Sequence, residues 1–163
     1  MFNHLMDVNY WRVVTIEDDA GQAELIQRAI RRWSNQVEVL HLVSGREVMS
    51  SFFNGHGRGC ESIPSLILLD IQLGDMDGLD ILRHFRESDL YRFVPIIVLT
   101  SSDIEEEVLR AYDNHANSFV VKATDHQDAF MEEIHAILDY WLCVNRPVRA
   151  PAFRSLLAPR VAG

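Results

Sequence analysis

Lysine is almost missing from this 163-residue chain, which has fourteen arginines but a single lysine, Lys122. Cysteine is scarce too, because Cys60 and Cys143 are too few for a disulfide scaffold and form no metal-binding motif. No apolar run approaches the roughly 18 residues of a membrane-spanning helix. Residues 1–7 lack the basic and apolar regions of a secretory signal. We therefore expect a cytoplasmic protein with free thiols and no membrane partner.

Charge is unevenly distributed along the chain. The net charge is -9, yet no acidic residue follows Asp139, so four later arginines make the tail basic. An acidic chain is poorly suited to nucleic acid or to an anionic membrane surface. We expect neither as a partner, and the 48% of apolar residues is enough for one ordinary core.

Short apolar segments alternate with longer segments of helical periodicity. Strands are predicted at residues 11–16, 37–43, 65–70, 94–100 and 118–121, and helices at 20–33, 45–54, 79–87, 103–113 and 125–143. Such alternation predicts an α/β fold: a doubly wound, five-stranded parallel sheet of order 2-1-3-4-5, the flavodoxin-like order. In the helix at 103–113 we expect Asp103 as N-cap, with Ile104, Val108, Ala111 and Tyr112 facing the core.

Two segments fall outside this pattern. Glycines at 55, 57 and 59 have the spacing of a phosphate-binding loop, but without a preceding strand or a following helix they favour a connector. After residue 143 the chain becomes apolar and basic, and three prolines interrupt any helix. We interpret residues 1–143 as one domain and 144–163 as a C-terminal arm, either dimerising or disordered.

Reactive side chains follow four of the five predicted strands. Glu17 and Asp18 come after the first strand, Asp70 ends the third, Thr100 ends the fourth and Lys122 follows the fifth. Ligands of an open parallel sheet bind outside the carboxyl ends of its strands, so these groups should converge. Each alone has a structural explanation, as a turn residue, a strand former or a solvated charge. Their joint placement favours a site.

The chemistry of these groups suits phosphoryl transfer. Clustered carboxylates repel unless a cation joins them, and hard oxygen ligands suit Mg²⁺. A carboxylate can then attack a phosphoryl group and form an aspartyl phosphate. The Thr100 hydroxyl could donate to a phosphoryl oxygen, and Lys122 supplies a compact charge that a guanidinium does not reproduce.

These residues resemble the receiver domain of response regulators over about residues 11–143. Intervals of 30 residues from Asp70 to Thr100 and 22 from there to Lys122 fit that family. The matching positions are the acidic pair Glu17-Asp18, the phosphoacceptor Asp70, the turn Asp77-Gly78, the switch hydroxyl Thr100, the aromatic switch Phe119 and the lysine Lys122. Gly74 and Ala123 depart from the pattern, since proline is usual at both positions.

The resemblance implies a mechanism and partners. A sensor histidine kinase would donate its phosphoryl group to Asp70. Asp18, Asp70 and the Gln72 carbonyl would bind Mg²⁺ directly, and Glu17 would bind it through a water molecule. Thr100 and Phe119 would then switch a surface around the fourth and fifth helices. Segments such as residues 17–25 and 116–122 also resemble stand-alone regulators of phytochrome photoreceptor kinases, which favours a bacteriophytochrome partner and a homodimer.

Under this hypothesis the chain is a phosphoacceptor switch, not an enzyme, with at most self-catalysed phosphotransfer and autodephosphorylation. About 20 residues follow the last predicted helix, too few for a DNA-binding module, so output would be protein–protein contact or onward phosphotransfer. Two rivals remain. A phosphatase of the haloacid dehalogenase type needs an acid two residues after its nucleophile, where this chain has Gln72. A passive receiver would not need the intact acid, hydroxyl and lysine set.

Overall fold

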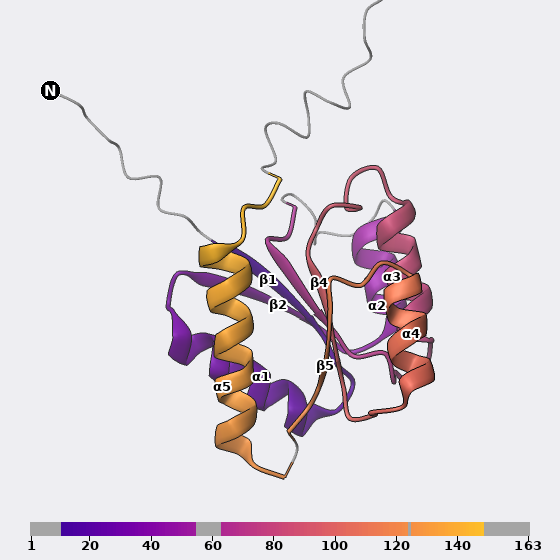
Figure 1. Cartoon of the computed structure of the whole chain (residues 1–163). Helices are drawn as coiled ribbons and strands as arrows, with labels where there is room; N and C mark the ends of the chain where they lie inside the picture. The colour runs from indigo at the N-terminus through magenta and orange to yellow at the C-terminus, as the bar shows by residue number, and fades with distance from the viewer. Residues whose placement is uncertain (1–10, 55–62, 124, 149–163) are drawn as a thin grey trace, which may run out of the picture.

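A parallel sheet with helices on both faces forms the core of the computed structural model, which describes residues 11–54, 63–123 and 125–148 (Figure 1). Its elements are β1 (Trp11–Ile16), α1 (Ala20–Trp33), β2 (Val37–Leu42), α2 (Gly45–Val48), β3 (Leu66–Leu69), α3 (Gly78–Glu87), β4 (Ile96–Thr100), α4 (Glu105–Asp113), β5 (Ser118–Val121) and α5 (Gln127–Leu138). Two π-helical turns, η1 (Met49–Phe53) and η2 (Asp139–Val144), extend α2 and α5. The strand order is β2-β1-β3-β4-β5, and every neighbouring pair is parallel. The predicted doubly wound sheet is confirmed.

Alternate residues of the central strands face the two helical layers. Figure 1 shows α1 and α5 on one face of the sheet and α2, α3 and α4 on the other. In β3, Leu66 and Leu68 belong to the cluster with α1 and α5, whereas Ile67 and Leu69 belong to the opposite cluster. All four are almost fully buried. The continuous apolar run therefore follows from a strand that is covered on both sides.

The fourth helix differs from its prediction. It begins at Glu105, and Ile104 occupies the N-cap position without a side-chain cap, so the expectation of Asp103 as N-cap is wrong. Ala111 is buried, but Ile104 and Tyr112 are 56% and 49% exposed, which contradicts their predicted inward orientation. The phenol of Tyr112 instead accepts a hydrogen bond from the backbone N–H of Phe119, 3.3 Å away. Of the residues of α4, only Ala111 is buried.

Some predictions fall outside the described residues. They concern the glycines of 55–59, Cys60, and the arm from residue 149 onward. Among the helices that the structure describes, none is long and apolar enough to cross a membrane.

Candidate functional site

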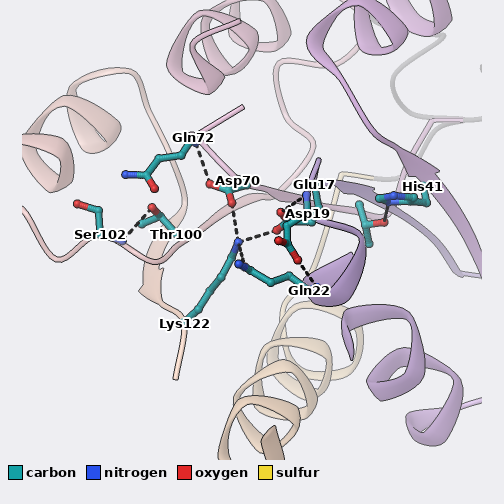
Figure 2. Close-up of polar contacts among 10 residues, drawn as sticks. Glu17, Asp19, Gln22, His41, Asp70, Gln72, Thr100, Ser102 and Lys122 are labelled. Carbon is teal, nitrogen blue, oxygen red and sulfur yellow. Dashed lines mark hydrogen bonds and ion pairs between the residues drawn. The ribbon is translucent and has the colours of Figure 1, made fainter. Parts of the chain in front are cut away.

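The ammonium group of Lys122 lies at the centre of the predicted site (Figure 2). Its Nζ is 2.6 Å from Glu17 Oε2 and 2.6 Å from Asp70 Oδ2. These three residues come from the ends of β5, β1 and β3, and all are buried, with Lys122 only 4% exposed. The structure thus brings together three side chains that the sequence places more than 50 residues apart.

The phosphoacceptor candidate, Asp70, has both carboxylate oxygens occupied. Oδ2 accepts from Lys122, and Oδ1 accepts from the backbone N–H of Gln72 at 2.8 Å. The next helix packs tightly against this loop, since a Cβ on Gly78 would lie 2.4 Å from the Cα of Ile71. Glycine at position 78 is therefore required by close approach, and it fixes the backbone that carries Asp70.

The carboxyl group of Glu17 is buried. Burial raises its pKa above the usual value, while the hydrogen bond and positive charge of Lys122 act in the opposite direction. The negative charge of Asp70 adds to the increase. Its second oxygen, Oε1, accepts from the backbone N–H of Asp19 at 3.1 Å. The two carboxylates outnumber the one ammonium, so the site lacks positive charge, which is the electrostatic condition for binding a cation.

Thr100 and Phe119 lie on the neighbouring strands β4 and β5. Thr100 is fully buried, its Oγ1 accepts from the N–H of Ser102, and its carbonyl accepts from the N–H of Lys122 at 2.8 Å. Phe119 is partly buried against the hydrophobic cluster under α3 and α4. Both predicted switch residues are therefore close in the fold to the lysine that contacts Asp70.

Oxygen donors suited to a hard cation lie at the same edge. Asp18 is exposed, and its Oδ2 accepts from the N–H of Gly74 at 2.9 Å. Proline has no N–H, so Gly74 holds Asp18 in a way that the proline usual in the resembled family could not. Carboxylate and carbonyl oxygens of this kind fit Mg²⁺. Within the described residues, however, no three acidic, histidine or cysteine side chains already converge on one metal position, because Glu17 and Asp70 point to Lys122.

Two contacts of the site were missed in the sequence. Gln22, in the first turn of α1, accepts the third hydrogen bond of Lys122 through Oε1 at 2.6 Å. Asp75, in the loop after Asp70, accepts from the backbone N–H groups of Gly45 and Arg46 at the start of α2. The sequence offered one sign of the Gln22 contact, namely its place one helical turn after the acidic residues 17–19. It offered no sign of the Asp75 contacts, because their partners lie about 30 residues away in the chain.

The loop after Asp70 is also tied to α4. Arg110 Nη2 lies 3.1 Å from Asp77 Oδ2, and Asp77 in turn caps α3 by accepting from Leu79 N–H.

The far end of α4 is held by Arg86, which donates to the carbonyl oxygen of His115, a residue with a positive φ of 63°. Burial lowers the pKa of Arg86 to about 10, so it stays protonated at neutral pH.

Comparisons with known proteins agree with this geometry. A family model described as the response regulator receiver domain matches residues 13–135. The chain belongs to the response regulator receiver domain family. The probable methanogenesis regulatory protein FilR2 of Methanothrix harundinacea is 32% identical over 82% of this chain and 85% of its own length. Response regulator Rcp1 of Synechocystis is 28% identical over 80% of this chain and 88% of its own length.

Solved receiver structures have the same fold. The phosphorylated cyanobacterial phytochrome response regulator RcpA superposes with a TM-score of 0.80 at 26% identity, covering 86% of this chain and 99% of that one. The Mn²⁺-bound form of Rcp1 gives a TM-score of 0.76 at 25% identity, covering 85% and 99%. The receiver domain thus retains the fold of phytochrome-associated relatives at modest sequence identity.

The Asp75 contact generates a pH-dependent prediction. Hydrogen bonds from Gly45 and Arg46 hold the pKa of Asp75 below its usual value, so its stabilising effect exists above the unfolded-state pKa and is lost as pH falls through the folded-state pKa. We expect Asp75→Asn to lower the free energy of unfolding at neutral pH by at most about 1 kcal/mol, because the carboxylate is exposed.

Urea denaturation from neutral pH to below pH 3 would measure this difference, which should shrink toward the acid end. Asp89→Asn is a matched control, since the exposed Asp89 pairs only weakly with Arg92 at 3.4 Å. A constant difference between Asp75→Asn and the parent across the whole range would contradict the prediction.

Proposed function

We propose that this receiver domain accepts a phosphoryl group from the phosphohistidine of a sensor histidine kinase onto Asp70. One observation carries the proposal: the buried ammonium of Lys122 lies 2.6 Å from the carboxylate that would be the nucleophile. A carboxylate oxygen would attack phosphorus, the new O–P bond forming as the P–N bond breaks and its electron pair returns to the imidazole. The ammonium is placed to neutralise charge on the transferred oxygens.

Mg²⁺ belongs to this proposal. Asp18, Asp70 and the Gln72 carbonyl would hold the ion, with Glu17 acting through water, and the Mn²⁺-bound form of the relative Rcp1 supports a divalent cation. The ion would supply charge neutralisation at the phosphoryl oxygens. The chain's own residues orient the carboxylates: Gly74 holds Asp18, and Gln72 holds Asp70.

The phosphoryl group would act as a conformational switch and not as a step in turnover. A hydroxyl at Thr100 can donate to a phosphoryl oxygen on the adjacent strand, and its movement would leave space for Phe119. Phe119 contacts α4 through Tyr112, and the loop after Asp70 contacts the same helix through the Arg110–Asp77 ion pair. Output would therefore be a protein–protein contact around α4, β5 and α5, set by the population of two states.

The kinase partner is proposed to be a phytochrome. RcpA is a phytochrome response regulator, and the superposition with this chain covers 99% of RcpA. A bacteriophytochrome with a histidine kinase module would present the phosphohistidine. A cytoplasmic location, the compartment expected from the sequence, is part of the same proposal.

The phosphoacceptor assignment has a direct test. Incubation with acetyl phosphate and Mg²⁺ should add one phosphoryl mass to the intact protein, and Asp70→Asn should abolish the addition. Asp89→Asn, which changes an exposed carboxylate with a 76% exposed side chain, should be labelled normally. Labelling of Asp70→Asn at another residue, measured by intact mass and peptide mapping, would defeat the assignment. The same experiment with the kinase and labelled ATP tests the donor.

The lone lysine generates a second prediction. In Lys122→Arg the charge is kept, but a planar guanidinium cannot offer one nitrogen to three acceptors at 2.6 Å. We expect the phosphorylation rate to fall by about tenfold or more, which corresponds to about 1.4 kcal/mol. Phosphodonor-induced NMR shifts at Thr100 and Phe119 should fall with it. Arg83→Lys, at an exposed surface pair, is the control, and wild-type switching in Lys122→Arg would remove the proposed role.

A homodimer through the C-terminal arm is the remaining part of the proposal. The arm leaves the domain beside a groove of about 550 Å³, whose lining includes Trp11, Leu90, Trp141 and Val148. Val144 and Val148 are 71% and 49% exposed there, which favours burial against a second copy.

The expected result is that the full chain is dimeric in light scattering and that a chain ending at Val144 is monomeric, since the apolar arm is lost. A chain shortened only by residues 162–163 serves as the control and should remain dimeric. A chain ending at Val144 that stays dimeric would refute the dimerising arm.

A further inference from the structure

Lys122 has three hydrogen-bond donors, and the described structure accounts for all of them. Two go to the carboxylates of Glu17 and Asp70, and the third goes to the amide oxygen of Gln22, each at 2.6 Å. An ammonium can donate three hydrogen bonds, so this set is complete. Gln22 is thus the one uncharged acceptor in the set, and it comes from α1 and not from a strand end.

The contact to Gln22 closes a ring of hydrogen bonds (Figure 2). Lys122 donates to Glu17 Oε2, and Glu17 Oε1 accepts from the N–H of Asp19 at 3.1 Å. Asp19 Oδ1 caps α1 by accepting from the N–H of Gln22 at 2.8 Å. The side chain of Gln22 then returns to Lys122. The start of α1 is in this way rigidly connected to the ammonium.

We propose that Gln22 is a positioning residue for the phosphoryl transfer, a role that rests on the proposed function of Asp70. The hydrogen bond that Lys122 donates to Gln22 Oε1 fixes the direction of the third N–H, so the other two point at Glu17 and Asp70. Because the amide is neutral, it does this without a further negative charge beside the existing carboxylates. Without Gln22, the ammonium keeps its charge but loses one of the contacts that hold it over Asp70.

Gln22 reaches Lys122 from the wall of a surface recess of about 390 Å³, which Arg28 and Gln127 also line. The side chain is therefore partly exposed and not part of the apolar core. Substitution at position 22 can remove the acceptor while the core stays intact. Gln27, on the same helix, provides a matched control because its amide oxygen contacts only the exposed Arg31 within the described hydrogen bonds.

The test measures the rate constant of phosphorylation against the acetyl phosphate concentration, in Mg²⁺, by intact-protein mass spectrometry. Gln22→Leu should lower the maximal rate constant by about tenfold, since a hydrogen bond to a charged group is lost, and leave the half-saturating concentration nearly unchanged. Gln27→Leu should match the parent. Gln22→Glu restores an acceptor of equal reach but adds a negative charge beside Glu17 and Asp70, so its rate should exceed that of Gln22→Leu and stay below the parent's. Thermal unfolding checks that each variant is folded, and Gln22→Ala replaces the leucine variant if that one is unstable.

A Gln22→Leu rate equal to the parent's would overturn the proposal, and so would equal losses in Gln22→Leu and Gln27→Leu. Failure of Gln22→Glu to exceed Gln22→Leu would overturn it as well, because the acceptor would then not be the cause. These results leave the function of Asp70 standing, since the parent is labelled in all of them. A parent protein that is never labelled on Asp70 would instead refute the proposed function itself.

Discussion

One buried ammonium holds the carboxyl ends of the sheet together. Lys122 is the single lysine of the chain, and its Nζ contacts Glu17, Asp70 and Gln22. Two carboxylates placed together away from water would repel strongly without it. An arginine carries the same charge, but its planar fork cannot put three acceptors around one nitrogen. All fourteen other Lys or Arg positions of the chain are arginine, so the one lysine stands where three acceptors surround a single nitrogen.

The sheet order explains why a long side chain is needed there. Lys122 follows β5 and Asp70 follows β3, and β4 lies between them. Two strand spacings amount to roughly 10 Å, which the extended lysine and the aspartate must bridge together. Thr100 ends β4, the strand that this contact crosses. The hydroxyl, the carboxylate and the ammonium are therefore brought together by strand order, and a phosphoryl group on Asp70 would lie within their reach.

The loop after Asp70 connects the site to the helices α2, α3 and α4 on one face of the sheet. Asp75 accepts from the start of α2, and Asp77 caps α3 and pairs with Arg110 of α4. The exposed Arg110–Asp77 ion pair is modest by itself, since such pairs contribute at most about 1 kcal/mol, and a side-chain cap of a helix N-terminus contributes a similar amount. Together they connect the loop after Asp70 to three helices, while Gln22 connects the lysine to a fourth. The contacts around Asp70 and Lys122 thus reach helices on both faces of the sheet.

The sequence by itself determined the sheet, its order and the residues at its strand ends, because apolar runs and helical periodicity reflect local burial. It also identified Glu17, Asp70, Thr100 and Lys122 as neighbours, since parallel strands share one carboxyl edge. Only the tertiary structure decided that Gln22 accepts the third hydrogen bond of Lys122 and that the N–H of Gly74 binds Asp18. It also decided that Ile104 and Tyr112 of the α4 region lie exposed. These depend on side-chain direction and on contacts between residues far apart in the chain. Periodicity carries no information on either, because it records how much of a segment is buried and not against what.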